Sequence, residues 1–93
     1  MGKYSVFKLP TDLLKITAQN VAQLRKQNRW TQSELAERSG VSFGSIKRFE
    51  RTGQISYESL LKIAEVLGRL EAFEAVFEPN DTNKVSDLFN EQK

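Results

Sequence analysis

One short stretch of the chain carries the side chains with the clearest chemical potential. Phe43, Lys47 and Arg51 are spaced four residues apart, and Gly44 and Arg48 follow the same spacing. In a helix, this spacing places all five on one face. Arginine can donate two parallel hydrogen bonds to guanine O6 and N7, and both cations bind phosphate. The pattern indicates a nucleic-acid-binding face, with an ordinary solvated face as the alternative.

The charge distribution along the chain points the same way. Residues 1–53 contain ten basic and four acidic residues, whereas residues 54–93 contain four basic and eight acidic ones. The formal net charge of +2 therefore divides into +6 and −4. This asymmetry suggests a basic working surface in the first half of the chain. Chance scatter of solvated charges is the alternative.

The composition excludes several other functions. The 93 residues correspond to one small domain, and the absence of cysteine excludes disulfides and thiolate metal sites. The absence of histidine removes the commonest general base and metal ligand. There is also no base–nucleophile pattern and no glycine-rich phosphate loop. We therefore expect no enzyme activity, catalytic residue, metal site or cofactor.

No stretch of the sequence indicates a membrane or secreted protein. No apolar run reaches the roughly 18 residues needed to span a bilayer. The first residues lack the apolar core of a signal peptide. A soluble cytoplasmic protein without a membrane partner is expected.

Helices must position the basic face, and capping residues predict where the first two lie. The first should begin with Thr11 as its N-cap and end near Asn28, although a second possible N-cap at Thr17 could split it. Residues 31–34, Thr-Gln-Ser-Glu, form a capping box that predicts a second helix. Gly40 suits the left-handed residue at the end of that helix.

Three more helices are predicted after this turn. Ser42 can cap the third helix, which ends at residues 52–54. Ser56 can cap the fourth, which carries an apolar stripe and stops at Gly68. The fifth is marked by three apolar residues, Leu70, Phe73 and Phe77.

The predicted fold class is all-α, a compact bundle of about five short helices. We expect an N-terminal extension over residues 1–17, in which residues 3–9 could form a short strand. The main domain is expected over residues 18–78. An acidic tail, residues 79–93, follows it.

The spacing around Gly40 predicts that the second and third helices cross closely. Ala36 lies four residues before this glycine and Ile46 six residues after it. Helices joined by so short a turn need a small residue where their backbones meet, and Ala36 meets that need. Ile46 and Phe49 should be buried together with Val41, while the basic face of the third helix projects outward. Trp30 is expected to pack on the core.

The stretch from Gln32 to Arg51 resembles the helix-turn-helix of the Cro/repressor type, also called the XRE family. The flanking residues 25–26, 30–32 and 59–68 match as well, so the resemblance covers about residues 18–68. It implies a lambda-repressor-like fold and a sequence-specific transcriptional regulator that acts as a repressor. It also implies a homodimer that docks residues 42–51 in the major groove of double-stranded DNA.

The resemblance also assigns roles to individual residues. The expected DNA-binding residues are Gln32, Ser42, Phe43, Gly44, Ser45, Lys47, Arg48 and Arg51. Among these, Gln32 and Arg51 should contact phosphate and Arg48 should read a base. Arg25 and Glu50 match a structural pair that joins the first and third helices. Phe43 and Gly44 depart from the long polar residues of many relatives, which leaves the base preference open; Phe43 could pack on a thymine methyl group.

A second resemblance concerns the region after the fourth helix. A fifth helix followed by a short tail is similar to HipB-like antitoxins, which bind both operator DNA and a kinase-like toxin. The chain could therefore neutralise a toxin and regulate its own operon. In that case the tail anchors would be Val85, Leu88 and Phe89, at helical spacing. For the homodimer, the candidate interface residues are Leu70, Phe73 and Phe77, with core packing as the equal alternative for Phe73 and Phe77.

Overall fold

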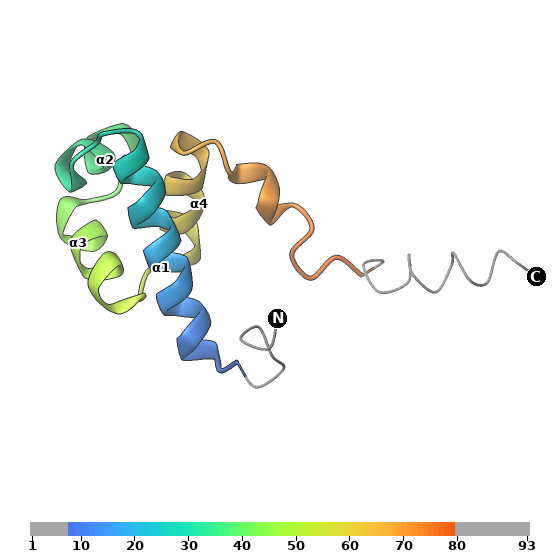
Figure 1. Ribbon diagram of the computed structural model, residues 1–93. Coiled ribbons are helices and arrows are strands. Elements are labelled where there is room, and N and C mark those ends of the chain that lie inside the picture. The colour runs from blue at the N-terminus through green and yellow to red at the C-terminus, as the bar shows by residue number, and fades with distance from the viewer. Residues whose placement is uncertain (1–7, 80–93) are drawn as a thin grey trace, which may run out of the picture.

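The computed structural model describes residues 8–79. It contains four α-helices, α1 (Pro10–Gln27), α2 (Gln32–Ser39), α3 (Phe43–Thr52) and α4 (Tyr57–Val66), and a short 3-10 helix, η2 (Leu70–Phe73) (Figure 1). No strand occurs in this part of the chain, and the predicted all-α fold class is confirmed. Residues 3–7 of the proposed strand lie outside the described residues, as do the candidate tail anchors Val85, Leu88 and Phe89.

Helix α1 begins two residues earlier than the sequence predicted. Its N-cap is Leu9, and the carboxylate of Asp12 accepts a hydrogen bond of 2.9 Å from the Leu9 N–H. Pro10 takes the first helical position, where a missing N–H costs nothing. The prediction of Thr11 as the N-cap was therefore wrong, because Thr11 already lies inside the first turn.

Helix α1 then continues without interruption to Gln27. Thr17 does not split it, and the C-cap is Asn28, where the end of the helix was predicted. The expected boundary between residues 17 and 18 falls inside α1, so residues 10–17 belong to the same helix as the residues that follow. The division into three domains otherwise stays a prediction.

The three following helices begin at the hydroxyl caps that the sequence indicated. Thr31 accepts a hydrogen bond from the Glu34 N–H, and the Glu34 carboxylate accepts one from the Thr31 N–H, which completes the capping box. Ser42 caps α3 and Ser56 caps α4 in the same way. Each cap satisfies an N–H group that the first turn of a helix leaves without a partner.

The core lies where α1, α2, α3 and α4 converge. Leu35, Ile46, Phe49 and Ile63 are its largest fully buried side chains. Each helix contributes one apolar face to it, as the helical spacing predicted. Trp30 and Ala36 are partly buried and pack against this core, in agreement with their expected structural roles.

The region after α4 differs from the predicted fifth helix. Only Leu70–Phe73 are helical, as the 3-10 helix η2, and residues 74–77 form turns. Phe73 packs edge-on against Tyr57, with ring centroids 6.0 Å apart. Phe77 has a φ of 60°, a left-handed conformation that stops a helix and is rare for a bulky side chain.

Among the described helices, none is long and apolar enough to cross a membrane.

Candidate nucleic-acid interface

Helix α3 separates the predicted DNA-binding residues from the core. Seven of the eight lie on α3 or at its N-cap and are exposed: Ser42, Phe43, Gly44, Ser45, Lys47, Arg48 and Arg51. Ile46 and Phe49, on the opposite side of the helix, are buried. The same helix thus anchors itself in the core and presents a basic face to solvent.

The start of α3 carries small residues, Ser42, Gly44 and Ser45, which leave its backbone accessible. The Ser42 hydroxyl accepts a hydrogen bond of 3.1 Å from the Ser45 N–H and donates one of 2.8 Å to the Ser45 hydroxyl. A Cβ atom added at Gly44 would meet no atom within 4 Å. The missing side chain of Gly44 therefore leaves open space on the exposed face, through which another molecule can approach the helix closely.

Phe43 and Lys47 form a pair on this face. The Lys47 Nζ lies 5.6 Å from the centroid of the Phe43 ring, within the range of a cation–π contact. Phe43 remains 47% exposed. The pair offers an apolar surface beside a positive charge.

Arg48 has a partner that the sequence did not reveal. One of its terminal nitrogens donates a hydrogen bond of 2.6 Å to the Gln54 Oε1. Gln54 follows Gly53, whose φ of 84° ends α3 and turns the chain back beside the helix. The guanidinium keeps further N–H donors, so Gln54 can hold Arg48 without using up its capacity to bind another acceptor.

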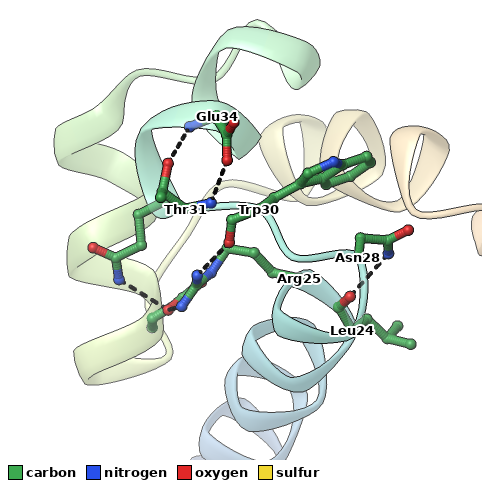
Figure 2. Close-up of polar contacts among 8 residues, drawn as sticks. Leu24, Arg25, Asn28, Trp30, Thr31 and Glu34 are labelled. Atoms are coloured by element: carbon green, nitrogen blue, oxygen red, sulfur yellow. Dashed lines mark hydrogen bonds and ion pairs between the residues drawn. The ribbon is translucent and has the colours of Figure 1, made fainter.

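A partly buried polar network fixes α3 to the elements before it. The predicted pair Arg25 and Glu50 forms an ion pair, with the Arg25 Nε 2.8 Å from the Glu50 Oε2 and only 10% and 9% of the two side chains exposed. A second Arg25 nitrogen donates to the Glu50 Oε1 at 3.0 Å. The third donates to the Trp30 carbonyl at 2.7 Å, as Figure 2 shows. The guanidinium therefore links α1 to α3 and to the loop before α2.

Gln32 belongs to the same network. Its Nε2 donates a hydrogen bond of 2.9 Å to the Glu50 Oε1. The sequence had predicted a contact of Gln32 with phosphate. An amide nitrogen carries two N–H donors, so this bond leaves one for another acceptor. Thr31 and Glu34, drawn beside Arg25 in Figure 2, cap the helix that Gln32 opens. The start of α2 and the body of α3 are thus tied through one carboxylate.

Sequence reasoning missed the contacts that join residues distant along the chain. Gln54 carried no motif, and its relation to Arg48 depends on the turn at Gly53. The bond from Gln32 to Glu50 spans 18 residues. Arg38 lies over the Trp30 ring, 4.4 Å from its centroid, and helps to hold the α1–α2 loop. Only the identity of Arg25 and Glu50, taken from the resemblance, pointed to this network.

Comparison with known proteins agrees with this arrangement. The model of the helix-turn-helix family matches residues 21–73, which is more than half of the chain and contains α2, α3 and α4. No curated protein and no solved structure matched the sequence. The matched region includes the exposed face of α3 and the whole Arg25–Glu50–Gln32 network. The chain therefore belongs to the helix-turn-helix family of the XRE type, and it is a DNA-binding transcriptional regulator.

Proposed function

We propose that the protein is a sequence-specific repressor that docks α3 in the major groove of its operator. The exposed face of α3 carries this proposal, because Phe43, Lys47, Arg48 and Arg51 lie there while Ile46 and Phe49 are buried. An α-helix fits the major groove, where each base pair presents a distinct pattern of donors and acceptors. Occupation of a promoter by such a protein hinders other proteins from binding there.

Arg48 and Arg51 are assigned different tasks on this face. Arg48 projects from the middle of α3, where a guanidinium can donate to guanine O6 and N7. Gln54 supports it by fixing one of its nitrogens. Arg51 lies nearly one turn nearer the C-terminal end of α3 and binds phosphate at the groove wall, which contributes affinity but no sequence information.

The N-terminal halves of α2 and α3 complete the proposed interface. Gln32 donates its second amide N–H to a phosphate, and the positive end of the α2 dipole favours the same anion. At the start of α3, Phe43 packs on a thymine methyl group while Gly44 lets the backbone approach the base edges. Ser42 and Ser45 lie at the edge of the groove.

A homodimer accounts best for specific binding. One helix-turn-helix buries little DNA surface, and such proteins usually read two half-sites separated by about one helical turn, roughly 34–36 Å. Apolar side chains exposed after α4, chiefly Leu70 and Phe77, are the proposed contact with the second copy. In Figure 1 this region leaves the helical body on the side away from α3, so a dimer formed there keeps both α3 helices accessible.

A second candidate function is that of an antitoxin that also regulates its operon. It is favoured by the surface charge beyond α3, because residues 54–79 contain five acidic and only two basic residues. Such a surface repels DNA and is left for a protein partner. Co-expression with a kinase-like toxin encoded beside this gene would test it, and growth rescue is the expected result if the antitoxin role holds.

Selection of bound sequences from random duplex DNA tests the main proposal. The expected result is one enriched motif that occurs as two inverted half-sites with centres about one helical turn apart. Enrichment of a single half-site would refute the dimer and leave α3 docking in place. No enriched motif, with binding to all duplexes alike, would refute sequence-specific recognition.

A further inference from the structure

An open apolar groove lies between α1 and α4. Its volume is about 470 Å³, and its apolar walls include Val21 and Leu24 from α1, Leu60 from α4, and Leu67 and Phe73 beyond them. A cavity of about 150 Å³ is enough to hold benzene. The groove therefore has room for an aromatic ring together with a neighbouring side chain, and no part of residues 8–79 fills it.

Next to this groove, the chain exposes an aromatic side chain that its own fold does not use. We call residues 74–79, which follow η2, the arm. Phe77 in the arm is 98% exposed, and Val76 beside it is 47% exposed. Phe77 also has a φ of 60°, which a bulky residue adopts only where its surroundings require it. The Phe77 ring thus lies almost wholly in solvent within one copy of the chain.

The charges of the arm and of the groove are complementary. The arm carries Glu74 and Glu78 and no basic residue. The groove lining contains Arg69 and no acidic residue. In Figure 1 the backbone of the arm runs away from the four-helix body.

We infer that Phe77 of one copy inserts into the α1–α4 groove of a second copy, and that the exchange is reciprocal. This inference rests on the proposed homodimer and specifies its interface. A twofold dimer buries the same surfaces on both subunits, so one symmetric contact fills both grooves and covers both Phe77 rings. Each arm then brings its acidic residues toward Arg69 of the other copy.

The first test compares two variants of the full chain by sedimentation equilibrium without DNA. Phe77→Ala removes the inserted ring, and Asn20→Trp places an indole over the groove from an exposed position on α1. Each should raise the dimer dissociation constant by about 100-fold or more, because the dimer loses two anchors worth at least about tenfold each. The control Leu13→Ala, an exposed apolar residue outside the groove, should leave the constant unchanged.

Mixing the two variants separates reciprocal insertion from general damage. A heterodimer of Phe77→Ala with Asn20→Trp keeps one intact groove facing one intact Phe77. The mixture should therefore dimerise at least about tenfold more tightly than either variant alone. No gain on mixing would overturn the inference.

A second measurement locates the arm directly. Because the chain has no cysteine, a spin label at Glu74→Cys is unique. The spin-labelled protein is mixed with isotope-labelled protein that carries no spin label. Broadening of the NMR signals is expected at the amides of Val21, Leu24 and Leu60 in the isotope-labelled chain. Broadening at other amides of the isotope-labelled chain, or no broadening, would overturn the inference.

The outcomes also distinguish the inference from the proposed function. A wild-type dimer that tolerates Phe77→Ala would refute the inference and leave the dimer in place. A wild-type protein that stays monomeric at several hundred micromolar would refute both the inference and the dimer. In that case, binding of α3 to a single half-site can still be measured independently.

Discussion

Glu50 accepts hydrogen bonds from three nitrogens that come from two other elements. Arg25 on α1 supplies two of them, at 2.8 and 3.0 Å, and Gln32 at the start of α2 supplies the third, at 2.9 Å. Its carboxylate therefore sets the position of α3 relative to both preceding helices. Since the charges are largely shielded from water, losing one partner costs more than losing a surface ion pair.

Substitution of Glu50 should therefore destabilise the fold. Glu50→Ala leaves Arg25 without a counter-charge and should lower the free energy of unfolding by about 3 kcal/mol. Glu65→Ala removes an exposed carboxylate on α4 and should change it by less than about 0.5 kcal/mol. Thermal unfolding followed by circular dichroism measures both, and the Glu50 variant should melt at least about 12 °C lower. Equal melting temperatures would contradict the structural role of the pair.

The contact between Gln54 and Arg48 predicts a smaller effect on recognition. Gln54→Ala releases the guanidinium and should reduce the preference for operator over random duplex by about 3- to 10-fold, the range of one exposed hydrogen bond. Gln19→Ala, an exposed glutamine on α1, is the matched control and should change nothing. Fluorescence anisotropy on both duplexes measures the ratio. An unchanged preference in the Gln54 variant would show that Arg48 needs no support.

The sequence predicted the side-chain contacts that form between residues close together along the chain. The caps at Thr31, Ser42 and Ser56 use hydroxyls three residues from their N–H partners, so local spacing reveals them. The partners of Arg48 and Gln32 arise only when turns bring distant segments together, and no local pattern marks them. The roles proposed for the DNA-contacting side chains stay predictions.

Among the elements, the turns that end α2 and α3 show how closely the helices pack. Gly40 and Gly53 both have positive φ, 79° and 84°. At Gly40 an added Cβ would meet nothing within 4 Å, whereas at Gly53 it would lie 2.8 Å from the backbone carbon of Leu14. The end of α3 therefore rests directly on the α1 backbone, and only glycine permits that approach.

A glycine series tests this packing. Gly40→Ala should cost about 1–2 kcal/mol of unfolding free energy, the strain of a left-handed residue with a side chain. Gly53→Ala should cost about 1–3 kcal/mol more, because α1 and α3 must also move apart. Gly44→Ala, inside α3 with free space around it, should stabilise the protein by about 0.5–1 kcal/mol. Urea unfolding measures all three, and equal losses at Gly40 and Gly53 would contradict the close approach.

The two errors in element prediction have physical causes. Thr11 has the chemistry of an N-cap, but Pro10 starts a helix without needing an N–H partner and the Asp12 carboxylate caps the Leu9 amide instead. After α4, the apolar spacing of Leu70, Phe73 and Phe77 matched a helix. The chain leaves the body there, so little packing stabilises a helix beyond Phe73, and short helices depend on packing.

Over the whole molecule, the basic and acidic surfaces lie on different elements. The basic face belongs to α3, while acidic residues of the second half of the chain lie on α4 and in the arm. The family match ends at residue 73, before the acidic tail. Removal of residues 80–93 should therefore leave operator affinity within about twofold, because the tail carries more acidic than basic groups and DNA repels them. A truncated protein that folds but loses its affinity would contradict this.

The central claim is that Arg48 makes a base-specific contact with DNA, whereas Arg51 contacts phosphate. Salt titrations of Arg48→Ala and Arg51→Ala, each on the selected operator and on a scrambled duplex, test it most directly. Arg48→Ala should weaken operator binding by about 1–3 kcal/mol and leave scrambled-duplex affinity almost unchanged. Arg51→Ala should weaken both alike and lower the salt slope by about one unit. Equal losses on the two duplexes for Arg48→Ala would show that Arg48 is only a phosphate contact and would contradict this docking of α3.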